Sequence, residues 1–134
     1  MKPPTAQVRV LYVDTDQMGV VNNIHYLRYF EIGRAEWIRQ HGAPYKKIEE
    51  DGYRLPVVEA HLRYKEPARY DDLLSIDAAP EDVRAATVQF KYAIRRSGDG
   101  ALLCEGYTKH ACLGADGKLR RFPDHLLAML RPQT

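Results

Sequence analysis

The stretch from Asn23 to His41 constrains the fold most, because it can form one long helix and strand-like segments follow it. It contains no proline, and Gly42 then supplies the expected terminator. At 100° per residue, one broad face of this helix collects Tyr26, Leu27, Phe30, Trp37 and Ile38, with Ile24 and Ala35 at its edge. The opposite side carries Arg28, Arg39, His25, Glu36 and Gln40. We therefore expect a sheet to enclose the apolar face.

The remaining segments alternate polar and apolar residues with a period of two, as half-buried strands do. They predict strands at 7–12, 54–64, 72–78, 84–96, 101–113 and 119–122. The tetrapeptides SGDG (97–100) and ADGK (115–118) predict hairpin turns, and 44–50 and 125–130 predict short helical turns. The fold class is therefore α+β, with one long central helix against a curved antiparallel sheet of about five strands. A free edge or face of such a sheet needs a neighbour, so we expect an oligomer.

Length and charge exclude several classes of protein. The 134 residues, 45% of them hydrophobic, suit a single domain over 1–134. A net charge of +2, from 20 basic and 18 acidic residues, predicts neither a nucleic-acid nor a membrane partner. No apolar run approaches the roughly 18 residues that cross a bilayer, and the N-terminus does not resemble a signal peptide. We expect a cytoplasmic protein.

Neither the cysteines nor the loop carboxylates predict a metal site. Cys104 and Cys112 would lie about 26 Å apart along one strand, too far for a disulfide, and they form no CxxC pair for zinc. Asp14, Asp16 and Gly19 match the first, third and sixth places of a calcium loop. The pattern then fails, because its fifth, ninth and twelfth places hold Met18, Asn22 and His25.

Two charged residues, Glu31 and Arg34, intrude on the apolar face of the helix three positions apart. Ionised groups in such a place need partners or a cavity. They can form an ion pair at a subunit contact, or Glu31 can line a ligand pocket, and the sequence leaves both interpretations open.

The run YVDTDQMGVVNNIHYLRYFEIGRAEWIR (12–39) resembles the hotdog-fold acyl-CoA thioesterases of the 4-hydroxybenzoyl-CoA thioesterase type, through DTDxMGVV and FExGRxE. Weaker similarity continues through 55–74. The resemblance implies a helix wrapped by the sheet, subunits paired edge to edge, and active sites at the interface of a homodimer that assembles into a homotetramer. The substrate would be an acyl-CoA, so coenzyme A is part of the substrate and no separate cofactor is expected.

The resemblance places the catalytic carboxylate on Asp16 and the backbone N–H that polarises the thioester carbonyl on or near Asn23. The first N–H groups of a helix have no intrahelical partner, so they can stabilise a developing oxyanion. Asp16 can activate water or attack the carbonyl itself. Gly19 would let the loop approach the ligand, and Tyr26 and Glu31 would contact the substrate. The family departs from this sequence at Asn22 and Asn23, which leaves the acyl group in doubt.

Other roles for these residues remain open. The structural alternative for Asp16 is a turn bond to nearby backbone N–H groups, and Asp14 is expected to partner loop backbone. The phosphates of coenzyme A need cations, for which Arg84, Lys91, Arg120 and Arg121 are candidates. A non-catalytic acyl-CoA or acyl-carrier-binding module is the alternative function. Dimer and tetramer cannot be distinguished from the sequence.

Overall fold

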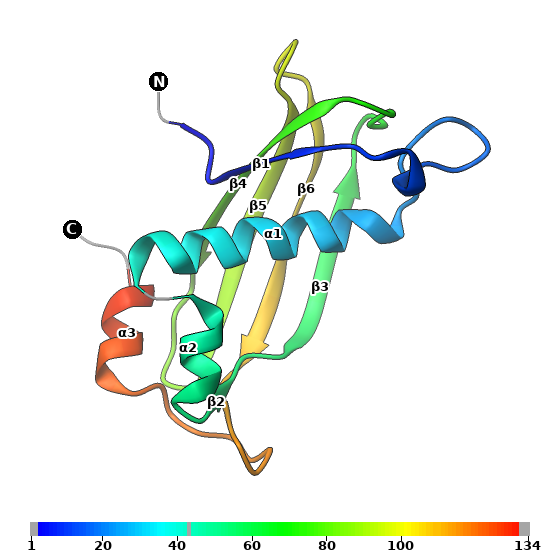
Figure 1. The fold of residues 1–134 in the computed structure, drawn as a ribbon. Coiled ribbons are helices and arrows are strands. Elements are labelled where there is room, and N and C mark those ends of the chain that lie inside the picture. Colours follow the sequence, from blue (N-terminus) through cyan, green and yellow to red (C-terminus); the bar gives the residue numbers. More distant parts are fainter. Residues whose placement is uncertain (1–2, 43, 132–134) are drawn as a thin grey trace.

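A long helix, α1 (Ile24–His41), lies across a five-stranded antiparallel sheet in the computed structural model, which describes residues 3–42 and 44–131 (Figure 1). The strand order is β1 (Ala6–Arg9), β4 (Leu73–Glu81), β5 (Thr87–Arg96), β6 (Leu102–Ala111) and β3 (Val57–Tyr64). This arrangement confirms the predicted α+β class and the single central helix.

Shorter elements lie at both ends of the molecule. They are the 3-10 helix η1 (Tyr12–Asp14), α2 (Tyr45–Glu50), β2 (Tyr53–Arg54), β7 (Leu113–Gly114) and α3 (Asp124–Leu130). η1 lies beside the N-terminal end of α1, and the others lie near its C-terminal end (Figure 1). β2 and β7 pair in a separate two-stranded sheet, and α2 and α3 lie together near the C-terminal end of α1 (Figure 1). The two short helices match the turns predicted at 44–50 and 125–130.

The buried face of α1 is rotated about the helix axis from the predicted face. Tyr26, Phe30, Trp37 and Ile38 are buried as expected, but Tyr29 and Gly33 are buried too. Leu27 was predicted on this face and is instead 43% exposed, because the helix turns residues 26, 30, 33 and 37 toward the sheet. A Cβ at Gly33 would come within 2.6 Å of Ile76 Cγ2, so this glycine lets helix and sheet approach closely.

The inward face of the sheet follows the predicted alternation. Val88, Phe90, Tyr92 and Ile94 of β5 are buried, whereas Lys91 and Arg95 are exposed on the other face. Cys104 and Cys112 are fully buried free thiols, as the sequence predicted. No helix among the described residues is long and apolar enough to cross a membrane.

Several predicted strands have different bounds. The strand expected at 84–96 begins at Thr87, and the one expected at 101–113 is divided into β6 and β7 at Cys112. The strand expected at 7–12 ends at Arg9, because the Asp14 carboxylate draws the Leu11 N–H into the 3-10 turn that follows. The strand expected at 54–64 is two strands, β2 and β3, separated by Leu55 and Pro56, since proline lacks an N–H for the ladder. The strand expected at 119–122 is only an isolated bridge between Leu119 and Leu113.

The edge strand β3 is the most open element of the sheet. Its eight residues are all exposed except Leu62, which is half-buried. Ala60, Leu62 and Tyr64 pair with the helix-facing positions Thr108, Gly106 and Cys104 of β6, as the alternation predicted. Little covers that face of β3, and its outer edge has no strand beside it in the described chain.

Candidate active site

Residues 14–22 form a short hairpin-like segment, called the Asp16 ribbon here, in which 14–16 and 20–22 are two antiparallel arms. The second arm leads directly into α1. Asp16 N–H donates to Val20 O and Asn22 N–H donates to Asp14 O, both at 2.9 Å, while Thr15 bridges Val21. Gly19 closes the turn with φ of +78°, a conformation that other residues rarely adopt. The ribbon extends away from the sheet beyond the N-terminal end of α1 (Figure 1).

Asp16 is exposed at the tip of this ribbon. Its Oδ1 accepts a hydrogen bond from Met18 N–H at 2.8 Å, and its carbonyl accepts one from Gly19 N–H at 2.9 Å. The turn bond that the sequence offered as the structural alternative is therefore formed. Within the described residues Oδ2 has no hydrogen-bond partner, so half of the carboxylate still faces outward.

The start of α1 presents an unoccupied backbone donor. Asn22 Oδ1 accepts from Ile24 N–H at 3.2 Å, and Asn22 O accepts from His25 N–H at 3.0 Å. The N–H of Asn23, which precedes both of these donors, donates to no acceptor in residues 3–42 and 44–131. Asn23 is exposed, so this donor can reach a ligand.

Asp14 is buried and serves the scaffold. Its carboxylate accepts from Leu11 N–H at 3.1 Å, from Arg28 Nη2 at 2.6 Å and from the Tyr29 hydroxyl at 2.8 Å. Burial raises the pKa of Asp14, but the hydrogen bonds from Leu11 and Tyr29 and the charge of Arg28 outweigh it and hold the pKa below its usual value. The predicted bond to loop backbone is confirmed.

The contacts of Asp14 with α1 were missed in the sequence analysis. Arg28 and Tyr29 follow Asp14 by 14 and 15 residues, across the ribbon, and no motif spacing marks such a pair. The predicted buried face of the helix does not include Tyr29, so helix periodicity does not indicate this contact either.

Tyr26, predicted to contact substrate, is buried in the single chain. Its hydroxyl accepts from Ala68 N–H at 3.2 Å, and its ring lies edge-on to Tyr64 at 5.3 Å between centroids. Burial raises the pKa of Tyr26. A substrate contact at Tyr26 remains a prediction.

Glu31 and Arg34 border a hollow of about 420 Å³ between α1 and the start of β3. Its other walls are mainly apolar: Ala35, Ile38, Tyr45, Leu55, Pro56 and Val57. The Glu31 and Arg34 side chains approach to 3.8 Å, with Glu31 71% and Arg34 17% exposed. Both sequence interpretations of this pair are therefore compatible with the structure.

A buried polar chain behind this hollow had no sequence signal. Arg34 Nη1 donates to the Tyr92 hydroxyl at 3.0 Å, which lies 2.6 Å from Thr108 Oγ1, and Thr108 lies 2.8 Å from His110 Nε2. His110 Nδ1 is 2.9 Å from Leu55 O. Burial first, and the charge of Arg34 second, lower the pKa of His110 to about 4, so the ring is neutral near pH 7.

The four cationic residues predicted to bind coenzyme A lie away from the Asp16 ribbon of the same chain. Arg84 N–H bonds to Thr87 O at the start of β5, and Phe122 N–H beside Arg121 bonds to Ala85 O. The ribbon is near the other end of β5, about 30 Å along a ten-residue strand. Arg84 pairs with Asp82 and Arg120 with Asp116, while Lys91 is on the outer sheet face. One chain does not bring these cations to Asp16.

The described residues contain no cluster of three or more His, Cys, Asp or Glu side chains that could hold a metal ion.

Comparisons with known proteins identify the family. The family model described as the thioesterase-like superfamily matches residues 10–130. The chain is 32% identical over 124 residues to the acyl-CoA thioesterase YbgC of Haemophilus influenzae, covering 90% of this chain and 89% of that relative. The chain therefore belongs to the thioesterase-like superfamily, of the 4-hydroxybenzoyl-CoA thioesterase type.

Solved structures agree on the fold. A hypothetical protein of Aquifex aeolicus superposes with a TM-score of 0.89 at 30% identity, over 94% of this chain and 98% of that one. A DHNA-CoA thioesterase of Staphylococcus aureus superposes with a TM-score of 0.85 at 28% identity, over 92% of this chain and 86% of that one. The sheet-wrapped α1 is the hotdog fold that the sequence resemblance predicted.

Proposed function

We propose that this protein is an acyl-CoA thioesterase that hydrolyses a thioester to a free acid and coenzyme A, with Asp16 as general base or nucleophile. The backbone N–H of Asn23 would donate to the carbonyl oxygen as negative charge develops on it. Family membership supports the activity, and the local geometry supports these two roles.

The observation that carries this proposal is the pairing of an unoccupied donor and an outward carboxylate on one ribbon. Asp16 stands opposite Val20, and Val20 precedes Asn23 by three residues. At strand spacing the backbones of Asp16 and Asn23 are therefore about 10 Å apart. An aspartate side chain, an attacking oxygen and a thioester carbonyl can fill that span. The groups therefore suit attack on one face of the carbonyl while its oxygen is bound at α1.

A second copy of the chain would complete the site. Val57, Val58 and Tyr64 of β3 are 47%, 59% and 48% exposed, and the strand is an open edge of the sheet. Such an edge can pair with its own copy in an antiparallel dimer, as the family resemblance implies. Antiparallel pairing places the Val57 end of one β3 beside the Tyr64 end of the other.

This pairing would bring together groups that one chain keeps apart. The Tyr64 end of β3 lies near Tyr26 at the start of α1, and the Val57 end borders the hollow with Glu31 and Arg34. The acyl group of a thioester bound at one ribbon could then enter the hollow of the second copy. Arg120 and Arg121, beside β2 and β7 at that same end, could reach the phosphates of coenzyme A. A tetramer of two such dimers, the cytoplasmic location and the single domain over 1–134 remain parts of this proposal.

The direct test is Asp16→Asn. Asparagine can keep the turn bond to Met18 N–H but cannot act as base or nucleophile. We expect thiol release to fall by about a hundredfold or more with an unchanged melting temperature. A screen of short, long and aromatic acyl-CoAs supplies the substrate, and Gln17→Ala in the same turn is the matched control. Full activity of Asp16→Asn would refute the assignment of Asp16.

One observation favours the alternative, a non-catalytic acyl-CoA or acyl-carrier-binding module. Half of the Asp16 carboxylate is occupied by the turn, which is what a purely structural aspartate would show. In that case acyl-CoA would raise the melting temperature without release of free thiol, for the unaltered protein and Asp16→Asn alike.

The dimer is tested separately with Val58→Arg. A charged, bulky side chain at the exposed edge should block pairing and release monomers, as measured by light scattering after gel filtration. Tyr70→Arg, which places the same side chain at a 58% exposed position outside β3, is the control. Dimers that persist in Val58→Arg with unchanged activity would exclude β3 as the interface.

A further inference from the structure

The loop 67–72 holds both ends of the segment that carries Asp16. At the first end, Val10 N–H donates to Asp72 O at 2.9 Å and Asp71 N–H donates to Val10 O at 3.0 Å. At the second end, Val21 N–H donates to Ala68 O at 2.8 Å, and Arg69 bridges Val20. A displacement of this loop would therefore reach the Asp16 ribbon directly at Val20 and Val21, and from Val10 through η1.

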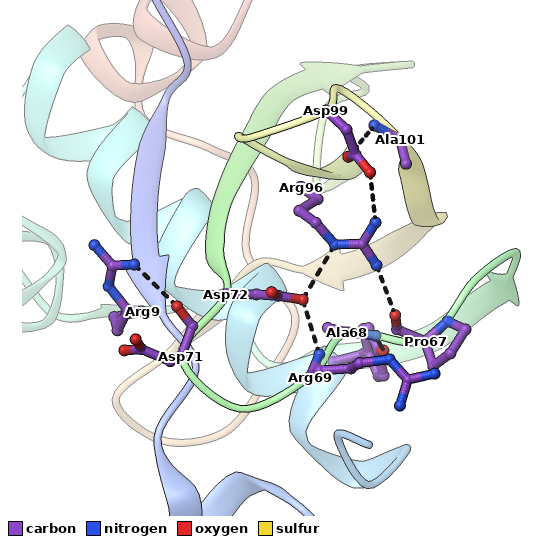
Figure 2. A network of polar contacts seen from close by, with 10 residues as sticks. Arg9, Pro67, Ala68, Arg69, Asp71, Asp72, Arg96, Asp99 and Ala101 are labelled. Carbon is purple, nitrogen blue, oxygen red and sulfur yellow. Dashed lines mark hydrogen bonds and ion pairs between the residues drawn. The ribbon is translucent and has the colours of Figure 1, made fainter. Parts of the chain in front are cut away.

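The conformation of the loop needs support from outside itself. Asp71 has φ of +70°, in the left-handed region that costs a non-glycine residue free energy. Arg9 Nη1 donates to Asp71 O at 2.9 Å, which supports one side of the loop (Figure 2). The other side faces the β5–β6 hairpin.

Arg96, near the end of β5, binds the loop from that hairpin with its whole guanidinium group. Nη2 donates to Pro67 O at 3.0 Å and Nε donates to Asp72 Oδ2 at 3.1 Å, so it grips the loop at its first and last residues (Figure 2). Asp72 Oδ2 also accepts from Arg69 N–H at 2.9 Å. Nη1 donates to Asp99 Oδ2 at 2.9 Å, which ties the guanidinium to the hairpin turn.

The bond from Arg96 to Asp72 is partly shielded from solvent, whereas the bond to Asp99, which is 57% exposed, is a surface contact. Arg96 and Asp72 side chains are both 23% exposed. Hydrogen bonds to Asp72 and Asp99 raise the pKa of Arg96, which therefore stays charged throughout the range in which the protein would work. Only a planar guanidinium can hold two carboxylates and a carbonyl in this geometry.

We infer that Arg96 is a positioning residue for catalysis, which sets the placement of Asp16 and of the Asn23 N–H through the loop 67–72. This role rests on the proposed function, because it assumes that the ribbon is where the thioester reacts. Arg96 does not touch the reacting atoms. Its effect would lie in geometry, to which catalysis is sensitive, since a misplacement of about 1 Å can cost about a hundredfold in rate.

The experiment compares two neighbouring arginines. Arg95 is exposed on the same strand, and among the described residues its side chain donates only to Gly100 O, so Arg95→Met is matched to Arg96→Met in position, size and charge. With the acyl-CoA that the unaltered protein cleaves fastest, Arg96→Met should lower kcat by about tenfold and change KM by less than about twofold. Arg95→Met should change neither.

A variant of the same charge guards against failure to fold. Arg96→Lys keeps the cation but cannot hold Pro67 O, Asp72 and Asp99 together, so kcat should fall several-fold while the melting temperature stays close to that of the unaltered protein. A structural role alone would lower stability without this division between kcat and KM. In the Asp16→Asn background, Arg96→Met should lower kcat by a smaller factor than in the unaltered protein, because one of the two groups that Arg96 positions is already inactive.

Amide hydrogen exchange tests the coupling without any substrate. The Val21 N–H, bonded to Ala68 O, should exchange at least about tenfold faster in Arg96→Met and Arg96→Lys than in Arg95→Met. Unchanged Val21 exchange, or an unchanged kcat in both Arg96 variants, would overturn the inference. If Asp16→Asn retains activity but Val21 exchange still responds to Arg96, the proposed function fails while the physical coupling between Arg96 and the ribbon stands.

Discussion

Two buried polar clusters fix α1 to the rest of the molecule, and they differ in how they satisfy their hydrogen bonds. Near the N-terminal end, the Asp14 carboxylate gathers Arg28, Tyr29 and the Leu11 N–H around a negative charge. Near the middle of α1, a chain of uncharged groups, Tyr92, Thr108 and His110, runs from Arg34 to Leu55 O. The first depends on a charge being present and the second on a charge being absent.

This difference makes the clusters sensitive to acid in separate pH ranges. Burial lowers the pKa of His110 to about 4, whereas histidine in the unfolded chain has a pKa near 6.5. The contribution of neutral His110 to the free energy of unfolding is therefore complete above about pH 6.5 and is lost as the pH falls toward 4. The pKa of Asp14 is lowered, so its contribution to the free energy of unfolding is complete above the usual pKa range of carboxyl groups. That contribution is lost as the pH falls through the lowered pKa. The middle of α1 should therefore loosen before its N-terminal end.

The largest change in the free energy of unfolding is expected from removing the buried carboxylate of Asp14. Asp14→Ala leaves the buried Tyr29 hydroxyl and the Leu11 N–H without their acceptor and Arg28 without its ion-pair partner, and at about 1 to 3 kcal/mol for each unsatisfied donor the free energy of unfolding should fall by about 3 to 5 kcal/mol. Equilibrium unfolding in urea measures this loss in the free energy of unfolding. Asp16→Ala, two residues away but exposed, should cost under about 1 kcal/mol. Equal losses in the two variants would show that Asp14 does not anchor the ribbon.

The second prediction concerns the neutral cluster. Between about pH 6.5 and 4 the free energy of unfolding should fall by about 3 kcal/mol because of His110, at 1.36 kcal/mol per pKa unit. His110→Gln should abolish most of this slope, measured by urea titrations at several pH values. His125→Gln, at an exposed histidine, should leave the slope in place. A slope that survives in His110→Gln would place the acid sensitivity elsewhere.

The smallest expected effect comes from a single atom of the neutral cluster. Tyr92→Phe removes the hydroxyl that accepts from Arg34 and bonds Thr108, at a cost of about 1 to 2 kcal/mol in unfolding free energy. Tyr70→Phe, at a 58% exposed position, should change it by less than about 0.5 kcal/mol. If the Tyr92 variant is as stable as the Tyr70 variant, Arg34 finds an equivalent partner in the adjacent hollow.

The long helix, the strand alternation and the family could be predicted from the residues alone, because these depend on local periodicity and on a run of neighbouring residues. The absence of proline through His41 predicted α1, and the Asp16–Gly19 turn was visible in the residues 12–39. The position of Asn23 at the start of the helix followed from the same run.

The contacts between side chains from distant segments could not be predicted in this way and are seen only in the folded chain. Asp14 meets Arg28 and Tyr29, and Arg96 meets Asp72, because the ribbon and the hairpin fold back onto other elements, and contacts of that kind leave no spacing in one sequence. Leu27 turned outward because the close approach at Gly33 sets the rotation of α1 against the sheet. Local patterns determine what each segment can form, whereas packing between distant segments determines what each residue touches.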